Sequence, residues 1–88
     1  MKINCLDYSA EDPKIDLSIE ECLLEDVKSN PDNVWLRFWR GRDSVIVGKS
    51  QDIEEVCNIE KCIEDEVGVY RRFSGGGAVF HDFGNLNI

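Results

Sequence analysis

The sequence predicts an α+β fold in which a mixed, mostly antiparallel sheet is flanked by helices. Apolar residues recur every four positions between Ile15 and Val27, and a second pattern of threes and fours runs from Ile53 to Val67. Both patterns are typical of amphipathic helices. The other apolar segments are short and rich in β-branched and aromatic residues, which favours strands. Helices and strands in this order are expected to pack as layers around one core.

The first third of the chain should form a strand and a helix. Residues 3–8 are expected to open the sheet. Asp12 and Pro13 then mark a helix start, because the Asp side chain can cap free N–H groups and Pro fits the first turn. Asn30-Pro31 should end the helix, since the residue before proline avoids the helical conformation. The stripe expected to face the sheet consists of Ile15, Ile19, Leu23 and Val27.

Two strands are expected next, paired as an antiparallel hairpin around a turn at residues 41–43. In VWLRFWR, residues 34–40, every second residue is apolar and the opposite face is aromatic and cationic. SVIVG, residues 44–48, is a continuous apolar run, typical of a central strand. We interpret Trp35 and Trp39 as packing residues rather than as a platform for a ligand.

The second helical pattern is expected to break near Asn58 and to stop at Gly68, a residue type suited to the position after a helix. Residues 69–73 resume the strand pattern. Two shorter strands, AVFH and LNI, should follow around a turn at residues 82–84. Residues 85–88 resemble a strand in mid-run, with neither a cap nor a turn after them. The chain is therefore expected to be a truncated part of a domain.

The composition is that of one small globular domain. Of its 88 residues, 42% are hydrophobic and 32% are charged, and no apolar run approaches the ~20 residues that span a bilayer. The amino terminus has neither a secretory signal nor an Arg-rich transit peptide, so we expect a cytoplasmic protein without a membrane partner. The net charge of −8 argues against general nucleic-acid binding.

Acidic residues are concentrated between residues 51 and 66, where we expect a solvated helix face. Any anion site must therefore be local. The chain has a single histidine and no C-x-x-C pair, so no metal site is expected. Reduced thiols that pack as small buried hydrophobes are expected for Cys5, Cys22, Cys57 and Cys62.

A run of three glycines lies between two strand-like segments, in the sequence SGGG at residues 74–77. It matches neither the G-x-G-x-x-G of a dinucleotide fold nor a P-loop. Without Cβ atoms, the loop can take positive φ angles, direct successive N–H groups at an anion, or lie against a flat ligand. A loose hairpin turn is the alternative interpretation.

Charged residues beside the glycines favour anion binding. Arg71 and Arg72 are adjacent in a strand, so their side chains point to opposite faces, and one of them can hold a phosphate or carboxylate bidentately. The other is expected to pair with acids on a helix. His81 is the only histidine, and a structural role and a catalytic one are both open for it. Asp82 adjoins it, and can equally be a turn residue.

The stretch RRFSGGGAVFHDFGNLN, residues 71–87, closely resembles the signature of the lipoate-protein ligases. That pattern is two arginines, a variable residue, Ser or Thr, three glycines, Ala-Val-Phe/Tyr-His-Asp and then Gly-Asn-x-Asn. Glu20-Glu21 on a helix, the strand LRFWR and the run SVIVGKSQ are similar in kind to segments of this family. The resemblance covers the whole chain and is most specific from Arg71 onward.

This resemblance implies a fold like the catalytic domain of class II synthetases and biotin ligases, of which residues 1–88 would be the N-terminal portion. It implies ATP, Mg²⁺ and lipoate, with lipoate attacking the α-phosphate to give lipoyl-adenylate and pyrophosphate. A lysine of a lipoyl domain of a 2-oxoacid dehydrogenase, or of the glycine-cleavage H protein, would then take the acyl group.

The resemblance also implies roles for individual residues. Arg72 would contact the nucleotide phosphate, and His81 would help to order the site. The residues that would line the nucleotide are Gly77, Ala78, Val79 and Phe80. The loop around lipoate and the adenylate would be shaped by Ser74, Gly75 and Gly76.

One functional residue of the family has no match. The family's lysine that contacts both lipoate and nucleotide lies well beyond the signature, and neither Lys49 nor Lys61 corresponds to it. The 88 residues alone are therefore expected not to ligate lipoate. Activity should need the remainder of the domain, in a longer chain or in a second polypeptide.

Other functions are open at this point. An octanoyltransferase of the same fold would use a cysteine nucleophile, but no cysteine follows the signature, and Asn85-x-Asn87 favours the ligase. A non-catalytic module that binds lipoate, adenylate or a partner subunit is another alternative, with strand addition as its means of binding. Outside the family, a small acidic adaptor also suits the composition. The acyl group, the acceptor and the oligomeric state are not determined by the sequence.

Overall fold

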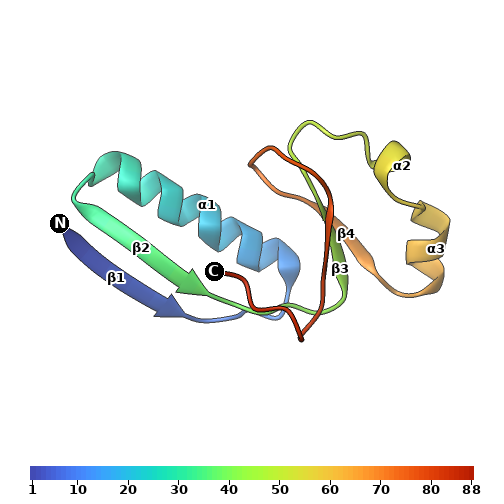
Figure 1. Cartoon of the computed structure of the whole chain (residues 1–88), viewed down its shortest axis with the longest axis horizontal. Coiled ribbons are helices and arrows are strands. Elements are labelled where there is room, and N and C mark those ends of the chain that lie inside the picture. The colour runs from blue at the N-terminus through green and yellow to red at the C-terminus, as the bar shows by residue number, and fades with distance from the viewer.

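The computed structural model describes residues 1–88 as a flat, elongated molecule with extents of 46 × 26 × 16 Å. Two lobes lie side by side (Figure 1). The first contains β1 (Lys2–Asp7), α1 (Pro13–Ser29) and β2 (Asn33–Phe38). The second contains β3 (Ser44–Val47), α2 (Ile53–Val56), α3 (Ile59–Glu64), β4 (Gly68–Arg71) and β5 (Val79–His81). The expected order of helices and strands is confirmed up to β5.

The expected strand at the end of the chain is reduced to one contact. Asn87 forms an isolated antiparallel bridge with Trp39, and the two residues exchange backbone hydrogen bonds of 3.1 and 2.9 Å. This bridge brings the end of the chain back to the first lobe, beside the end of β2 (Figure 1).

Local signals set both ends of α1, as expected. Asp12 is the N-cap, and its carboxylate accepts a hydrogen bond of 3.0 Å from the N–H of Lys14. Pro13 follows in the first turn, and Asn30 caps the other end through its N–H, which donates to Asp26 O. The helix therefore needs no tertiary contact to define where it begins and ends.

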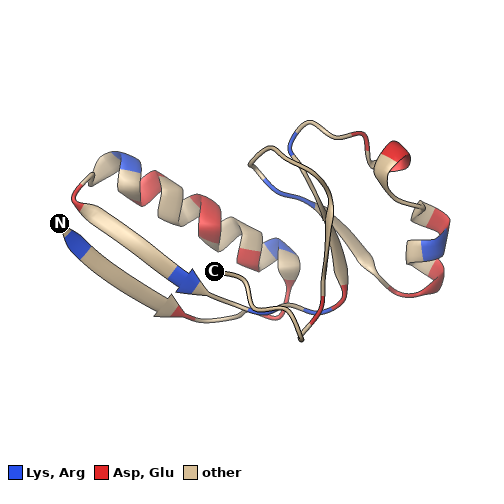
Figure 2. Cartoon of the chain, viewed as in Figure 1, with Lys and Arg blue, Asp and Glu red and all other residues tan.

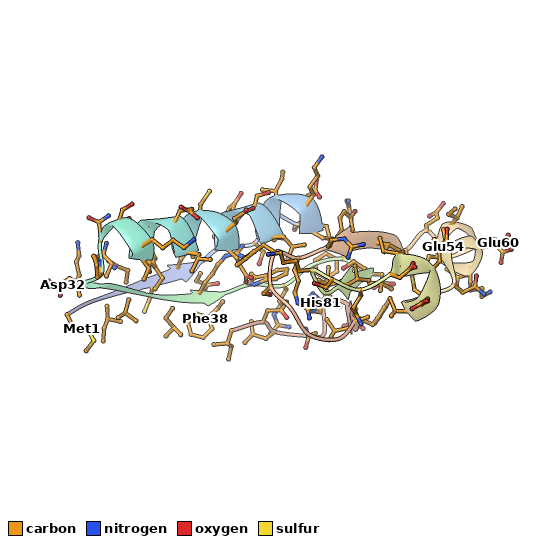
Figure 3. The ribbon with its side chains drawn as sticks, turned by 90° about the horizontal axis from the view of Figure 1, so that it is seen from above. Met1, Asp32, Phe38, Glu54, Glu60 and His81 are labelled. Atoms are coloured by element: carbon orange, nitrogen blue, oxygen red, sulfur yellow. The ribbon has the colours of Figure 1, made fainter.

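β1 and β2 form a two-stranded parallel sheet, and α1 is the crossover between them. α1 covers one face of this sheet, while Phe38 lies on the other side of the strands (Figure 3). It is the aromatic and cationic face of β2 that packs against α1. On the outer, apolar face, Val34 and Leu36 are 41% and 39% exposed.

Three carboxylates on α1, those of Asp16, Glu20 and Asp26, explain this orientation, because they accept hydrogen bonds from the inner face of β2 and from Trp39 just after it. The indole Nε1 of Trp35 donates to Asp26 Oδ2 at 2.7 Å, and Asn33 Nδ2 donates to the same oxygen at 3.0 Å. These hydrogen bonds lower the pKa of Asp26. Arg37 and Trp39 find similar acceptors near the start of the helix, as described below.

The predicted stripe of α1 is correct at three of its four positions. Ile19, Leu23 and Val27 are partly buried, whereas Ile15 is 50% exposed. Its place in the contact surface is taken by the fully buried Asp16. An apolar repeat of four residues drifts around a helix of 3.6 residues per turn, so its first member points away from the sheet.

The second sheet has the strand order β4-β3-β5. β3 is its central strand, as expected from the continuous apolar run, and Ile46 and Val47 are buried. The predicted hairpin between residues 34–40 and 44–48 is wrong, because β2 and β3 belong to different sheets. β3 pairs instead in parallel with β4 and antiparallel with β5. The three-stranded sheet is mixed, as expected, but the expected antiparallel majority is wrong, because β1–β2 and β3–β4 pair in parallel and only β3–β5 is antiparallel.

The second helical segment breaks at Asn58, as predicted. Asn58 caps α3 by accepting from the N–H of Lys61 at 3.0 Å. The helix ends before Gly68, however, because Glu66 adopts the left-handed conformation at φ 55° and Gly68 begins β4. Acidic residues lie along α2 and α3 (Figure 2) and are exposed, in agreement with a solvated face.

The core is small, with 9 of 88 residues buried. The expectation that the cysteines are buried is wrong for Cys5 and Cys22, which are exposed. Cys57 and Cys62 are partly buried, and burial raises the pKa of Cys57. None of the helices has the length and apolar character needed to cross a membrane.

Candidate anion site at the glycine loop

The glycine loop, residues 74–77, follows β4 and packs against the turn after β3. Gly48 lies so close to this loop that a Cβ atom on it would collide with the carbonyl oxygen of Gly76. Gly76 itself has φ +105°, which favours glycine. The N–H of Lys49 donates to Ser74 O at 2.8 Å. The two loops therefore hold each other through main-chain contacts that only glycines allow.

Arg72 fixes the glycine loop from inside. Its Nη2 atom donates to the carbonyl oxygens of Gly75 and Gly77, both at 2.8 Å, and Nε donates to Gly75 O at 3.3 Å. A longer hydrogen bond of 3.4 Å joins Nη1 to Ile46 O in β3. The guanidinium group thus draws the loop carbonyls toward the sheet and places a positive charge directly behind the loop.

The N–H groups of the same loop have no acceptor within the protein. Those of Gly75, Gly76 and Gly77 donate no hydrogen bond within the protein, and all three residues are exposed. Successive N–H groups without internal acceptors, next to a guanidinium, are an arrangement suited to an anion. A Cβ on Gly75 or Gly77 would touch nothing within 4 Å. The protein's own packing therefore does not require glycine at these two positions, whereas close approach of a ligand would.

Arg71 has a different role from the one expected. Its Nη1 atom donates to the carbonyl oxygens of Gly48, Lys49 and Gln51, at 2.9, 3.1 and 2.7 Å. The predicted pairing of this arginine with helix acids is wrong, because the turn after β3 offers three converging carbonyls instead. Arg71 thus orders the second loop of the site, as Arg72 orders the first.

A cavity of about 260 Å³ opens beside Arg72, between α1 and the sheet of β3 and β5. It is lined by apolar side chains and a few polar groups, which is typical of a small-molecule site. The lining residues are Leu17, Glu20, Trp39, Ile46, Arg72, Val79, His81, Asn87 and Ile88.

The polar wall of this cavity is braced by a buried ion pair. Arg37 Nη2 lies 2.6 Å from Asp16 Oδ1, with side-chain exposures of 5% and 0%. The same guanidinium lies 3.7 Å from Glu20 and 5.1 Å from the ring centre of Trp39. Trp39 Nε1 in turn donates to Glu20 Oε1 at 2.7 Å. Glu20 and Trp39 are therefore held in one orientation by groups behind them.

His81 completes this wall. Its ring meets Trp39 edge-on, with 5.5 Å between the ring centres, and its Nδ1 atom has no hydrogen-bond partner in the protein. Burial lowers the pKa of His81, and the charge of Arg72 acts in the same direction, while Glu20 opposes them. The lowered pKa favours the neutral imidazole, which can accept or donate one hydrogen bond.

A second cavity, of about 480 Å³, adjoins the first and shares Leu17 and Arg72 with it. It is the larger cavity of the two, and the first is the smaller cavity. The larger cavity lies between the start of α1 and the end of β4. Its other lining residues are Lys14, Ser18, Glu21, Lys49, Val69, Tyr70, Arg71 and Phe73.

The structure brings most of the sequence-predicted site residues together. Ser74 to Gly77 form one loop around Arg72, and Val79 and His81 reach the smaller cavity. Ala78 and Phe80 do not line either cavity, and Phe80 is 55% exposed. The nucleotide-lining role implied for Gly77, Ala78, Val79 and Phe80 stays a prediction.

Sequence reasoning missed several residues that build the site. Gly48 lies outside the glycine run, and Asp16 and Arg37 are 21 positions apart, so their pairing has no local signature. Trp39 was interpreted as a packing residue and does pack, but it also lines the smaller cavity. An acidic residue inside an apolar helix face was the signal that could have revealed Asp16.

Comparison with known proteins places this arrangement in context. Residues 12–88 match the family model of the lipoyl protein ligase A/B catalytic domain. The lipoate-protein ligase A of Psychrobacter cryohalolentis is 40% identical over the whole chain, which spans 25% of that protein. The chain thus spans about a quarter of the length of this curated relative.

Solved structures share the fold. A bipartite lipoate protein ligase from Thermoplasma acidophilum, described together with its E2 lipoyl domain, has a TM-score of 0.86 and 31% identity. The match covers 98% of this chain and 34% of that one. A lipoate-protein ligase A bound with ATP has a TM-score of 0.83 and 30% identity, with coverage of 97% and 34%.

Proposed function

Because the chain belongs to the lipoyl protein ligase A/B catalytic domain family, we propose that it forms the acid-activating site of an ATP-dependent lipoate-protein ligase. The observation that carries this proposal is the glycine loop. Its carbonyls are bound by Arg72 and by the Lys49 N–H, while the N–H groups of Gly75 to Gly77 are free and exposed. Free N–H groups can donate hydrogen bonds to the oxygens of a phosphoryl group, whereas the bound carbonyls are kept away from it.

In the proposed first step, a carboxylate oxygen of lipoate attacks the α-phosphorus of ATP and pyrophosphate leaves. Negative charge accumulates on the non-bridging oxygens of the α-phosphate, where the loop N–H groups and the charge of Arg72 stabilise it. In the second step, a lysine amine attacks the acyl carbon of the adenylate. An amide forms, AMP leaves with the electron pair of the broken acyl–oxygen bond, and the amine loses its proton.

The smaller cavity supplies a place for the acyl chain. Leu17, Ile46 and Val79 give it an apolar lining, and Arg72 stands at the side where a carboxylate would meet the phosphate. Neutral His81 can donate a hydrogen bond to a carboxyl oxygen without adding a competing charge. In this way His81 would help to order the site.

Mg²⁺ is expected to accompany ATP, but the chain offers few ligands for this ion. No group of three or more His, Cys, Asp or Glu side chains converges to hold a metal. A magnesium ion would therefore be bound mainly by the nucleotide phosphates and by water, where it would neutralise phosphate charge. Glu21 is the carboxylate that lines the larger cavity.

The acceptor is proposed to be a lysine of a lipoyl domain or of a glycine-cleavage H protein. The bipartite Thermoplasma ligase described with its E2 lipoyl domain supports this class of acceptor. We also propose that a further polypeptide segment, on this chain or on a partner, completes the domain. The apolar outer face of β1 and β2, with Ile3 63% exposed, supports a covering segment.

A lipoylation assay tests the function. Purified chain, ATP, lipoate and an acceptor domain are mixed with and without the completing polypeptide, and the mass of the acceptor is measured. We expect a lipoyl mass increase that requires ATP and the completing polypeptide, and that Arg72→Gln abolishes. Transfer from an acyl carrier protein without ATP would instead identify an octanoyltransferase, and binding of lipoyl-adenylate without any transfer would identify a non-catalytic module.

A further inference from the structure

We propose that Cys57 and Cys62 form a redox-active pair, whose thiols close a reversible disulfide across the first turn of α3. The pair lies at the junction of α2 and α3, at the end of the molecule away from α1 (Figure 1). It lines neither the smaller nor the larger cavity. Its thiol chemistry is therefore independent of the proposed ligase activity.

The cap of α3 explains why two cysteines five positions apart meet. Asn58 is the N-cap of this helix, and its side chain accepts a hydrogen bond of 3.0 Å from the N–H of Lys61. Cys57 therefore precedes the cap, and Cys62 is the fourth residue of the helix. Side chains at these two positions pack against each other in the hydrophobic staple of helix starts. On one continuous helix they would be about 140° apart in projection, so it is the break between α2 and α3 that brings them together.

Hydrogen bonds hold both residues in place. The Sγ and the N–H of Cys57 both donate to the carbonyl oxygen of Ile53, at 3.3 and 3.1 Å. The N–H of Cys62 donates to Asn58 O at 3.0 Å, in the first turn of α3. Two neighbouring thiols on an ordered backbone need little movement to reach the geometry of a disulfide.

The surroundings of the pair give its two thiols different roles. Burial raises the pKa of Cys57, and the nearby thiol of Cys62 adds to this effect through its charge and through a side-chain hydrogen bond. Cys57 therefore keeps its proton when Cys62 is a thiolate. Because the thiolate is the nucleophile in disulfide exchange, we assign the first attack to Cys62 and the second to Cys57.

An oxidant can reach the pair from solvent. Both cysteines are partly exposed, and Cys57 lines a hollow of about 730 Å³ at the junction. The same hollow is lined by Glu54, Glu55 and Glu60, whose carboxylates repel anions. A small uncharged disulfide is therefore the class of oxidant that suits this site.

The exchange balances with that disulfide as the only other reactant. The Cys62 thiolate forms a bond to one sulfur of the small disulfide, its S–S bond breaks, and the other half leaves as a thiolate that takes up a proton. Cys57 then loses its proton and attacks Cys62 Sγ, and the second half leaves in the same way. The protein is oxidised by two electrons, and the small disulfide is reduced to two thiols.

The other two cysteines provide an internal comparison. Both are exposed. Cys5 shares the exposed face of β1 with Ile3, whereas Cys22 lies on the helix that covers the opposite face. Neither has a thiol partner, so each should stop at a mixed disulfide with the small thiol.

Peptide mass spectrometry after treatment with hydroxyethyl disulfide tests the proposal. Remaining thiols are blocked with iodoacetamide, and the unreduced protein is digested with trypsin. Trypsin cleaves after Lys61, between the two cysteines, so their disulfide appears as residues 50–61 joined to residues 62–71. We expect these joined peptides from wild type, separated again by dithiothreitol, and mixed disulfides on Cys5 and Cys22.

Variants and urea show whether the fold builds the pair. The matched control Cys5→Ser/Cys22→Ser should give as many joined peptides as wild type, and Cys62→Ser should give none. The ratio of joined to mixed product should be at least roughly tenfold higher in the folded chain than in urea, because the fold orients the thiols. An equal ratio in both states, or mixed disulfides on Cys57 and Cys62 without joined peptides, would overturn the proposal.

A ligand at the glycine loop should not affect this reaction. The yield of joined peptides is measured with and without a non-hydrolysable lipoyl-adenylate analogue, and we expect no change, because the pair lines neither cavity of that site. Suppression of the disulfide by the analogue would overturn the assignment of a separate site.

Discussion

Gly48 and Gly77 both belong to the site, but a side chain would have different effects at the two positions. A Cβ at position 48 would collide with the Gly76 carbonyl, whereas a Cβ at position 77 would meet open space. The first glycine therefore serves the packing of two loops, and the second is free to serve a ligand.

Alanine substitutions at these two positions should separate stability from binding. We expect Gly48→Ala to lower the free energy of unfolding by about 1–3 kcal/mol, the usual cost of forcing an extra atom into a packed site. Gly77→Ala should leave that free energy within about 1 kcal/mol of wild type and weaken binding of the lipoyl-adenylate analogue by roughly tenfold. Urea denaturation and calorimetry measure the two quantities. An equal loss of stability in both variants would contradict this assignment.

The titration of His81 reports on the charged groups around the smaller cavity. Its pKa is lowered by burial and by Arg72 and raised by Glu20. We expect NMR titration to give a pKa below the ordinary value of about 6.5. Glu20→Gln should lower it further, and Arg72→Gln should raise it. Shifts in the opposite directions would show that neither charge acts on the imidazole as the geometry requires.

The lowered pKa of His81 makes the stability of the fold depend on pH. The unfolded chain binds a proton to this histidine at a higher pH than the folded chain does, because the folded pKa is depressed. Stability contributed by the neutral imidazole is therefore present above the unfolded pKa and is lost as pH falls toward the folded pKa. His81→Gln should abolish that part of the pH dependence.

At the scale of elements, α1 and β2 are joined by polar contacts as much as by apolar ones. Asp16 and Arg37 are both almost fully buried, and their ion pair holds Glu20 and Trp39 against the smaller cavity. A buried pair of this kind specifies which face of β2 meets the helix, since the opposite orientation would leave two charges unpaired.

Removing one partner of this pair should be costly. We expect Arg37→Met to lower the free energy of unfolding by about 3–5 kcal/mol, because it leaves the Asp16 carboxylate buried without its counter-ion. The double variant Asp16→Leu/Arg37→Met should recover most of that loss, since no uncompensated charge is left. Urea denaturation of the three proteins decides the matter. If the single variant proved as stable as wild type, the ion pair would not determine the packing of β2.

Local features of these elements could be predicted from the sequence, whereas contacts between distant residues could not. The ends of α1 and the break at Asn58 were predictable because capping residues act within a few positions. The hairpin was not, since β2 pairs with β1 and β3 pairs with β4 and β5, and these partners are set by tertiary packing rather than by the turn between β2 and β3. In the site, the contiguous glycine loop was predictable, whereas the Asp16–Arg37 pair depended on tertiary packing.

At the scale of the whole molecule, charge and apolar surface are distributed unevenly. Acidic residues cover α1, α2 and α3 (Figure 2), while the cations that line the larger cavity lie near the glycine loop. The outer face of β1 and β2 is apolar and exposed on the side opposite α1 (Figure 3). The molecule thus presents one surface suited to an anionic ligand and another suited to a covering polypeptide segment.

The central claim is that the main-chain N–H groups of Gly75, Gly76 and Gly77 bind the phosphoryl group of an activated acid. Backbone amide NMR of the chain, titrated with the non-hydrolysable lipoyl-adenylate analogue, tests it most directly. We expect the amide signals of these three glycines to shift to saturation, while Gly84, whose N–H donates to Asp82 at 2.8 Å, does not move. Saturable binding with shifts elsewhere and none in the three glycines would contradict the claim.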